Sequence, residues 1–198
     1  MARRLLSVLL AIAVTIILVG FFLPRDVLVQ RSVVIDASPE VAFRVLDDLR
    51  YFNAWSPWYA RNSNADYRLE GPVSGQGAAL AWSDMGGSET GRLRITDSQP
   101  PERIELQMTL GESESGQFFQ VQPQDGATEV TWGMRMRFGA LDLTGRYIGL
   151  MLPSLVGGDF NRGLVQLKDF LESHPGVMPP RPDALEPSDF PGREGESP

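Results

Sequence analysis

The sequence predicts an α+β fold, in which an antiparallel β-sheet packs against a long C-terminal helix and one transmembrane helix precedes this domain. Three observations support the prediction. The chain of 198 residues opens with an uncharged apolar run, its middle alternates apolar and polar residues in short segments, and its last apolar pattern is helical. The short spacing between the alternating segments leaves little room for helices, so neighbouring strands are expected to pair antiparallel through hairpins.

Residues 5–23 form the apolar run and contain no charged side chain. At about 1.5 Å per residue, their length approaches that of a hydrocarbon core about 30 Å thick. A cleaved secretory signal is the alternative, but its apolar region normally has about 7 to 15 residues and ends at a small-x-small site. This run ends instead in Phe21, Phe22 and Leu23. The sequence therefore favours an uncleaved transmembrane anchor, with residues 1–4 as a short cytoplasmic end.

The charges that flank the anchor predict its orientation. Arg3, Arg4 and the terminal amine precede the apolar run, whereas Arg25 follows it beside Asp26. The positive-inside rule places the more basic flank in the cytoplasm. The protein is therefore predicted to cross the membrane once and to expose its domain on the extracytoplasmic side, which is the periplasm if the source is bacterial.

The domain is expected to open with one strand and two short helices. Residues 27–35 alternate apolar and polar positions, with Arg31 as the exception on the apolar face. Ser38 suits the N-cap and Pro39 the first position of a helix whose apolar residues recur about every four positions. A second short helix is predicted over 52–59, and its internal proline should interrupt or end it.

Six further strands should complete a sheet with one dry and one wet face. The alternation is clearest over 127–138, where Trp132 and Met134 fall on one face and Glu129 and Arg135 on the other. Antiparallel sheets commonly bury one face and solvate the other. The strands are expected near residues 66–71, 77–84, 89–98, 102–110, 115–122 and 127–138.

The last folded element is predicted to be a helix over 142–173, broken by Pro153 and by Gly157 with Gly158. Its final part is amphipathic and is therefore expected to pack on the sheet. Residues 175–198 are rich in proline and acidic side chains and have few apolar residues to bury. They are predicted to form a disordered tail.

Composition narrows the possible functions of residues 27–173, which have the usual length of one compact domain. The formal net charge of −7 falls mainly on this domain, which argues against binding to nucleic acid. The absence of cysteine excludes disulfides, thiolate catalysis and thiolate metal sites. The one histidine, His174, has no partner at metal-ligand spacing. We therefore predict no catalytic residue, no metal ligand and no cofactor.

Two local sequences carry a family resemblance. VVIDASPEVAFRVLDDLRYFNAWSPW, at 33–58, resembles the opening of the polyketide cyclase/dehydrase branch of the START-like (SRPBCC) superfamily, and GGDFNRGLVQLKDFLE, at 157–172, resembles its closing helix. The likeness extends over nearly all of residues 27–173. It implies a helix-grip fold, in which a curved antiparallel sheet wraps around the C-terminal helix. It also implies an apolar cavity that receives a lipid, steroid or polyketide-like molecule in many relatives.

The resemblance makes the large apolar side chains of the domain candidates for lining this cavity. For each of them, ordinary core packing is the competing interpretation, and the two tryptophans of the W-S-P-W turn fit a hydrophobic plug as well as a portal. Asp84 would be paired, protonated or functional if it pointed inward, but it also fits the end of a strand. The predicted ligand-binding residues are Trp55, Trp58, Trp82, Met108, Trp132, Met134, Tyr147, Met151 and Phe160.

Three functional hypotheses follow. The first is a membrane-tethered, non-enzymatic module that binds a lipid or another apolar small molecule. The second is a scaffold with a filled core that engages a protein partner in the envelope. The third is an enzyme of the cyclase, dehydratase or hydrolase kind, which would need Asp84, Arg92 or Arg146 to converge with a tyrosine inside the cavity.

Overall fold

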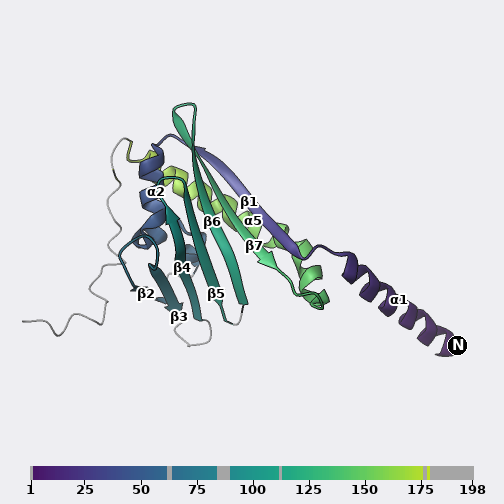
Figure 1. Cartoon of the computed structure of the whole chain (residues 1–198). Coiled ribbons are helices and arrows are strands. Elements are labelled where there is room, and N and C mark those ends of the chain that lie inside the picture. The colour runs from purple at the N-terminus through teal and green to yellow at the C-terminus, as the bar shows by residue number, and fades with distance from the viewer. Residues whose placement is uncertain (1, 62–63, 84–89, 112, 176–177, 179–198) are drawn as a thin grey trace, which may run out of the picture.

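The computed structural model describes residues 2–61, 64–83, 90–111, 113–175 and 178. Asp84 lies outside these residues, as does the predicted tail apart from Pro175 and Met178. The α+β prediction is confirmed (Figure 1). In chain order the elements are α1 (Ala2–Phe22), β1 (Asp26–Ile35), α2 (Pro39–Asp47), the 3-10 helix η1 (Leu49–Tyr51), α3 (Phe52–Trp55), α4 (Pro57–Arg61), β2 (Asp66–Glu70), β3 (Ala79–Ser83), β4 (Thr90–Gln99), β5 (Arg103–Leu110), β6 (Ser113–Gln124), β7 (Ala127–Arg137) and α5 (Leu143–Glu172).

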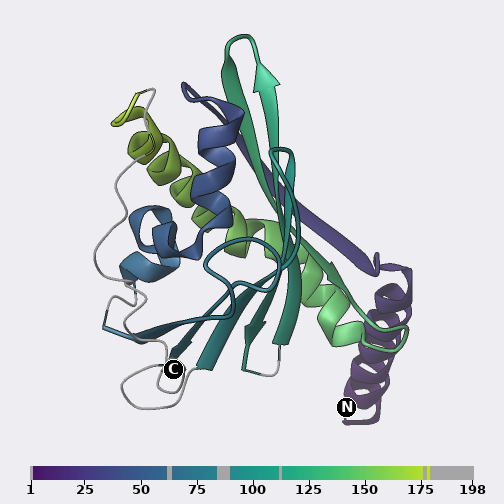
Figure 2. The same cartoon turned by 60° about the vertical axis from the view of Figure 1, so that its left-hand side comes forward.

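The seven strands form one antiparallel sheet in the order β1-β7-β6-β5-β4-β3-β2. Consecutive strands from β2 to β7 pair as hairpins, and β1 closes the sheet beside β7. Figure 2 shows the sheet curving past α5, with α2 on the same side, while α1 extends away from the domain. This arrangement is the helix-grip fold that the family resemblance implied.

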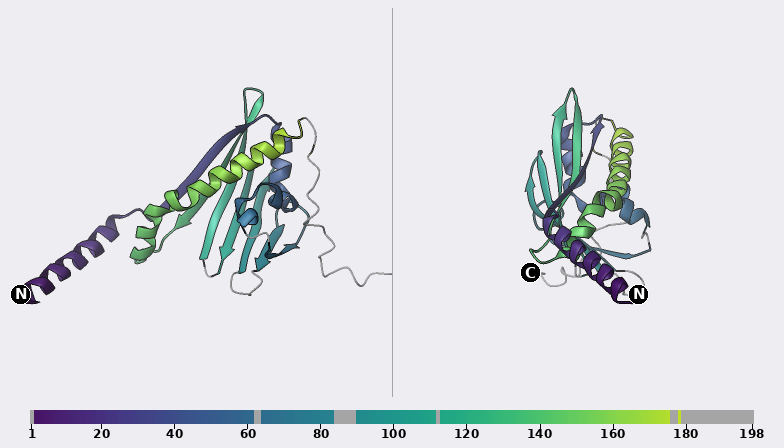
Figure 3. Two further views of the ribbon diagram at one scale, coloured as in Figure 1. Left: turned by 180° about the vertical axis from the view of Figure 1, so that it is seen from behind. Right: turned by 90° about the vertical axis from the view of Figure 1, so that its right-hand side faces the viewer.

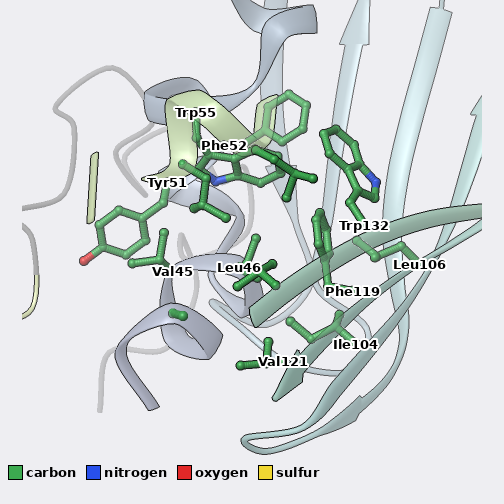
Figure 4. Close-up of a cluster of buried hydrophobic side chains, with 14 of the residues drawn as sticks. Val45, Leu46, Tyr51, Phe52, Trp55, Ile104, Leu106, Phe119, Val121 and Trp132 are labelled. Atoms are coloured by element: carbon green, nitrogen blue, oxygen red, sulfur yellow. The ribbon is translucent and has the colours of Figure 1, made fainter. Parts of the chain in front are cut away.

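Alternation along the strands separates a dry inner face from a wet outer face, as predicted. On β7, Val130, Trp132 and Met134 are buried, whereas Arg135 and Arg137 are exposed. Apolar residues from α2, η1 and α3 cover one end of the inner face. Figure 4 shows Leu46 and Trp55 from these helices facing Phe119 and Trp132 of the sheet, so the core lies between the helices and the inner face.

Local signals position the two short helices that follow β1. The Oγ of Ser38 accepts a hydrogen bond from the Val41 amide at the start of α2 (3.4 Å), with Pro39 as the first helical residue. The helical segment after η1 ends at Trp55 and restarts at Pro57. Because proline has no amide hydrogen and restricts the preceding residue, the predicted interruption occurs at this point.

The predicted breaks in the C-terminal helix were wrong, since α5 is continuous from Leu143 to Glu172. Gly157 serves close packing rather than a break, because a Cβ there would lie 2.5 Å from a guanidinium nitrogen of Arg31 on β1. Pro153 lies on the exposed side of α5, so its ring meets no neighbouring element. Figure 3 shows that α5 changes direction in its first part without ending. The turns of α5 on either side of these residues pack on the sheet, and this packing keeps the helix continuous despite the unfavourable residues.

Two glycines of α5 provide a matched test of this close packing. We expect Gly163→Ala to lower the free energy of unfolding by about 1 to 3 kcal/mol, because a Cβ would lie 2.6 Å from Trp132 Cζ3 and 3.0 Å from Pro57 Cδ. Gly158→Ala meets nothing within 4 Å and should stabilise the helix by about 0.5 to 1 kcal/mol. Thermal unfolding of both variants measures the difference. Equal effects would contradict close packing at residue 163.

Arg146 of α5 is buried and joins the domain to the end of α1. Its guanidinium group bridges two sets of backbone carbonyls, one from the C-terminal end of α1 and one from the loop before α5. Carbonyls at a helix end lack partners within the helix, and a cation is favourable beside them. The oxygen acceptors are Gly20 (3.3 Å), Phe21 (3.0 Å) and Leu23 (3.5 Å) for Nη1, and Gly139 (3.5 Å) and Ala140 (2.5 Å) for Nη2.

A second contact extends this joint along α1. The Tyr147 hydroxyl donates to the carbonyl oxygen of Ile16 (2.6 Å), and a Cβ at Gly20 would lie 3.2 Å from Tyr147 Cε2 and 3.4 Å from Leu143. Gly20 thus lets the first turn of α5 pack closely against the last turns of α1. We refer to the contacts of Arg146 and Tyr147 with α1 as the α1–α5 joint.

Candidate ligand-binding site

Trp132 of β7 lies at the centre of an aromatic cluster to which four other elements contribute rings. Its ring stacks on Phe160 of α5, with centroids 4.5 Å apart and an interplanar angle of 17°. Trp58 and Trp55 meet it edge-on at 5.1 and 5.6 Å. Phe119 of β6 lies 5.2 Å away. Four of the predicted residues, Trp55, Trp58, Trp132 and Phe160, therefore come together, and Trp132 itself is 1% exposed.

Gln117 brings one polar side chain into this apolar interior. Its Oε1 accepts the indole N–H of Trp132 (3.1 Å), and its Nε2 donates to the sulfur of Met108 (2.9 Å). In the sheet register it lies opposite Met134, which is also buried. Because an indole nitrogen only donates, the Gln117 oxygen must face Trp132 and its amino group must face Met108. The sequence analysis missed Gln117, although it precedes the inward Phe119 by two positions.

Half-buried aromatic side chains border the cluster on one side. The Tyr67 ring lies 6.3 Å from that of Trp82 and 4.8 Å from that of Tyr59. Trp58 of α4 contacts Trp132 edge-on. We call Trp58, Tyr59, Tyr67 and Trp82 the aromatic rim. Burial raises the pKa of the Tyr67 hydroxyl, with Tyr59 adding to the effect. The sequence analysis did not name Tyr59 of α4 or Tyr67 of β2, although Tyr67 and Leu69 alternate with charged residues along β2.

Two predicted residues lie away from the aromatic cluster. Tyr147 belongs to the α1–α5 joint, where its hydroxyl is bound to Ile16. Met151 is 60% exposed on the outer side of α5 and does not belong to the buried core. Both were predicted as cavity-lining residues, but neither faces the aromatic cluster, because positions around a helix point to different sides.

A pocket of about 330 Å³ lies elsewhere, on the outer face of β2, β3 and β4. Its lining includes Asp66, Arg68 and Arg92, and an ion pair joins Arg92 to Glu70 (2.6 Å). Strand alternation places these charged groups opposite the inner face. The pocket shares Trp82 with the aromatic rim and combines charged side chains with apolar surface.

The groups required for the enzyme hypothesis do not meet at Trp132. Arg92 is on the outer face and Arg146 is in the α1–α5 joint, while Asp84 is outside the described residues. Among the described residues, no group of three or more His, Cys, Asp or Glu side chains is placed to hold a metal ion. The described side chains in contact with Trp132 are aromatic rings and the amide of Gln117, which also contacts the thioether of Met108.

A bidentate ion pair fixes the helix that carries Trp58. Arg61 Nη1 and Nη2 donate to Asp159 Oδ1 (2.9 Å) and Oδ2 (2.7 Å), which ties α4 to α5. The Arg61 hydrogen bond is the main reason that the pKa of Asp159 is lowered from 3.8. A lowered pKa stabilises the fold above the unfolded value and loses this effect as the pH falls through the folded value.

We expect acidification below about pH 4 to loosen α4 from α5, and Asp159→Asn to remove part of this pH dependence. Because Arg61 is half exposed, Asp159→Asn should lower the free energy of unfolding by less than about 1 kcal/mol at neutral pH. Thermal unfolding between pH 7 and pH 3 tests both points. Identical pH profiles for the variant and the parent chain would contradict the assignment.

Comparison with known proteins agrees with this geometry. Residues 26–172 match the family described as polyketide cyclase / dehydrase and lipid transport. None of the curated proteins compared matches the chain. The matched residues extend from β1 to α5 and therefore include all the elements that form the cluster around Trp132.

Solved structures share the fold at low sequence identity. The di-domain ARO/CYC StfQ from the steffimycin biosynthetic pathway is 15% identical with a TM-score of 0.58, over 77% of this chain and 52% of StfQ. A protein from Rhodobacter sphaeroides is 17% identical with a TM-score of 0.54, over 75% of this chain and 93% of that one. Ms6760 from Mycobacterium smegmatis is 14% identical with a TM-score of 0.52, over 74% and 92%. The family match and the shared helix-grip fold together show that the chain belongs to the polyketide cyclase / dehydrase and lipid transport family.

Proposed function

We propose that this chain is a membrane-tethered binding module, which holds a lipid or another apolar small molecule against the aromatic rim and the inner face of the sheet. The observation that carries the proposal is the group of half-buried apolar side chains, the aromatic rim and Met108, that packs against the core beside the buried Trp132. Ligand sites are usually concave and apolar, with a few convergent polar groups. The family match supports the same class of ligand.

The rim and the methionines suit a flexible apolar ligand. Aromatic rings offer large apolar faces, and the unbranched side chains of Met108 and Met134 adapt to irregular shapes. If a ligand displaced the half-buried Met108, the apolar surface of the aromatic rim would extend towards Gln117. The ligand body would then lie between the sheet and α4, with Trp82 at the outer end.

Gln117 would favour a ligand that carries an oxygen acceptor. Its carbonyl is committed to Trp132, but its amino group faces only the thioether of Met108, which is a weak acceptor. A ligand carbonyl or hydroxyl oxygen that displaces Met108 would make a stronger hydrogen bond. A fatty acid, an isoprenoid alcohol and a polyketide each combine such an oxygen with an apolar body.

The tether in this proposal is α1. Residues Arg3–Phe22 form a helix with a mean hydropathy of 2.9, of which 6% is buried against the rest of the chain. Such a helix has the length and composition to cross a bilayer. With the basic N-terminus in the cytoplasm, the domain would work on the extracytoplasmic side, beside a membrane source of apolar ligand.

A photoreactive fatty acid tests the binding site. The full chain, reconstituted in vesicles, is labelled with a diazirine fatty acid, and the labelled peptides are mapped. We expect labels on the strands that carry Trp82, Met108 and Gln117, in addition to α1, which contacts bulk lipid. Met108→Trp should fill the site and lower labelling of the strands about tenfold, which corresponds to about 1.4 kcal/mol of binding free energy.

Two comparisons make the labelling experiment decisive. Labelling of α1 should stay constant in every variant, because it reports bulk lipid. Val165→Trp adds the same side chain at an exposed position of α5 and should leave labelling of the strands unchanged. Labels confined to α1 in the parent chain would contradict the proposed site.

A scaffold that engages an envelope protein is the second candidate function. The observation that favours it is the tight packing around Trp132, where Phe160, Trp55 and Phe119 already occupy three sides. In that case the cluster would be an ordinary core, and the acidic domain would act through its surface. One stoichiometric protein partner and no apolar ligand after purification would favour the scaffold.

A further inference from the structure

We propose that the front of α5, residues 143–158, lies in the interfacial layer of the membrane beside α1, so that lipid covers its outer apolar face. The inference rests on the proposed membrane span of α1, and it adds a second membrane contact that the family match does not include. The partner of the outer face of this helix is the surface of a lipid bilayer.

Beyond the buried Arg146, the front of α5 is mainly apolar on both sides. Its inner side packs on the sheet through buried residues such as Leu152. The outer side exposes Ile148 (48%), Met151 (60%) and Leu155 (59%), which recur at helical spacing, with Leu150 beside them. A helix that is apolar all round is normally covered on all sides, and soluble proteins rarely expose contiguous patches of this kind.

Charge divides α5 into two halves at the same point. Residues 147–158 contain no charged side chain. From Asp159 onward the helix carries five charged residues within fourteen, and its exposed positions include Arg162 and Asp169. Two halves of one helix thus present different surfaces, one suited to lipid and one suited to water.

The α1–α5 joint places this apolar half at the depth of the membrane surface. Tyr147 reaches the carbonyl of Ile16, six residues before α1 ends at Phe22, a distance of about 9 Å along the helix axis. The uncharged run of residues 5–23 barely spans a hydrocarbon core, so its last turns lie near the interface. Interfacial helices are buried about 5–10 Å into this layer.

Exposed apolar residues lie on both α1 and the start of α5 where the two helices meet, beside the exposed charged residues Arg25, Asp26 and Asp142. Figures 1 and 3 show the first turns of α5 beside the end of α1, on the same side of the domain. Leu141, 82% exposed in the loop before α5, and Phe22, 88% exposed at the end of α1, lie in the two segments that Arg146 bridges. Lipid that surrounds α1 would therefore also cover Leu141 and Ile148.

Nitroxide accessibility in vesicles tests the inference, because the chain has no cysteine and each label is unique. The full chain is reconstituted in phosphatidylcholine vesicles with one label at Met151→Cys, Leu155→Cys, Val165→Cys or Ile12→Cys. Val165 is the matched control, since it is 52% exposed on the charged half of α5. Ile12, in the middle of α1, reports whether the anchor spans the bilayer.

We expect the labels at residues 151 and 155, like the label at residue 12, to collide more often with oxygen, which concentrates in lipid, than with a water-soluble nickel complex. The label at residue 165 should collide more often with the nickel complex. Equal nickel accessibility at 151, 155 and 165, with 12 still in lipid, would overturn the inference and leave the tether intact. Nickel access at 12 would overturn the tether and the inference together. Protection of 151 and 155 from both reagents would show a protein partner or a second copy in place of lipid, and would also overturn the inference.

Discussion

Replacement of Trp132 by alanine is expected to lower the free energy of unfolding by about 3 to 5 kcal/mol. The side chain is 1% exposed and contacts rings from α3, α4, β6 and α5, so its removal leaves a cavity where these elements meet. It also leaves the Oε1 of Gln117 without its donor inside the core, which adds an unsatisfied polar group.

Urea unfolding followed by near-ultraviolet circular dichroism measures this loss, because the signal reports the packing of aromatic rings in the domain rather than the helicity of α1. Trp82→Ala is the matched control. The same side chain is only half buried there, on β3 next to the edge strand β2, so its loss should lower the free energy of unfolding clearly less. Similar costs for the two variants would contradict a central role for Trp132.

Replacement of Arg146 by leucine is expected to disconnect α1 from α5. The substitution leaves five backbone carbonyls, from Gly20 to Ala140, without the donor that now serves them. Removal of one partner from a buried charged network typically costs about 3 to 5 kcal/mol. The domain would remain attached through the short connection at residues 23–25 and through the single hydrogen bond from Tyr147 to Ile16.

Distances between two nitroxides, at Ile12→Cys and Val165→Cys, report this change in vesicles. We expect a narrow distribution in the otherwise unchanged chain and a broad one with Arg146→Leu. Arg146→Lys should also broaden it, because an ammonium donates from one point and cannot bridge both sets of carbonyls as a guanidinium does. A narrow distribution with leucine at 146 would contradict the assigned joint.

The sequence predicted those parts of the fold that depend on local patterns. Period-two alternation identified β7, because one face of the sheet is dry and the other is wet. Ser38 and Pro39 located the start of α2 through capping and the missing amide of proline. The predicted breaks in α5 failed because local propensity is weak against tertiary packing, as the contact between Gly157 and Arg31 shows.

The candidate site was less predictable than the fold. Large apolar residues at inward positions, such as Trp132 and Phe160, lie in one buried cluster, and their contact with a ligand stays a prediction. Gln117 and Arg146 were not assigned their partners, because hydrogen bonds between residues far apart in sequence follow from the fold and not from spacing. Met151 pointed outward because the helix places it opposite the buried side.

Native mass spectrometry of the full chain, released from nanodiscs and followed by organic extraction, tests the central claim most directly. We expect one defined apolar species, which carries an oxygen acceptor, to remain bound in a 1:1 ratio and to be lost in Met108→Trp. A clean mass of the protein alone, even after incubation with total lipid extract, would contradict the binding module and leave the partner-binding scaffold as the better account.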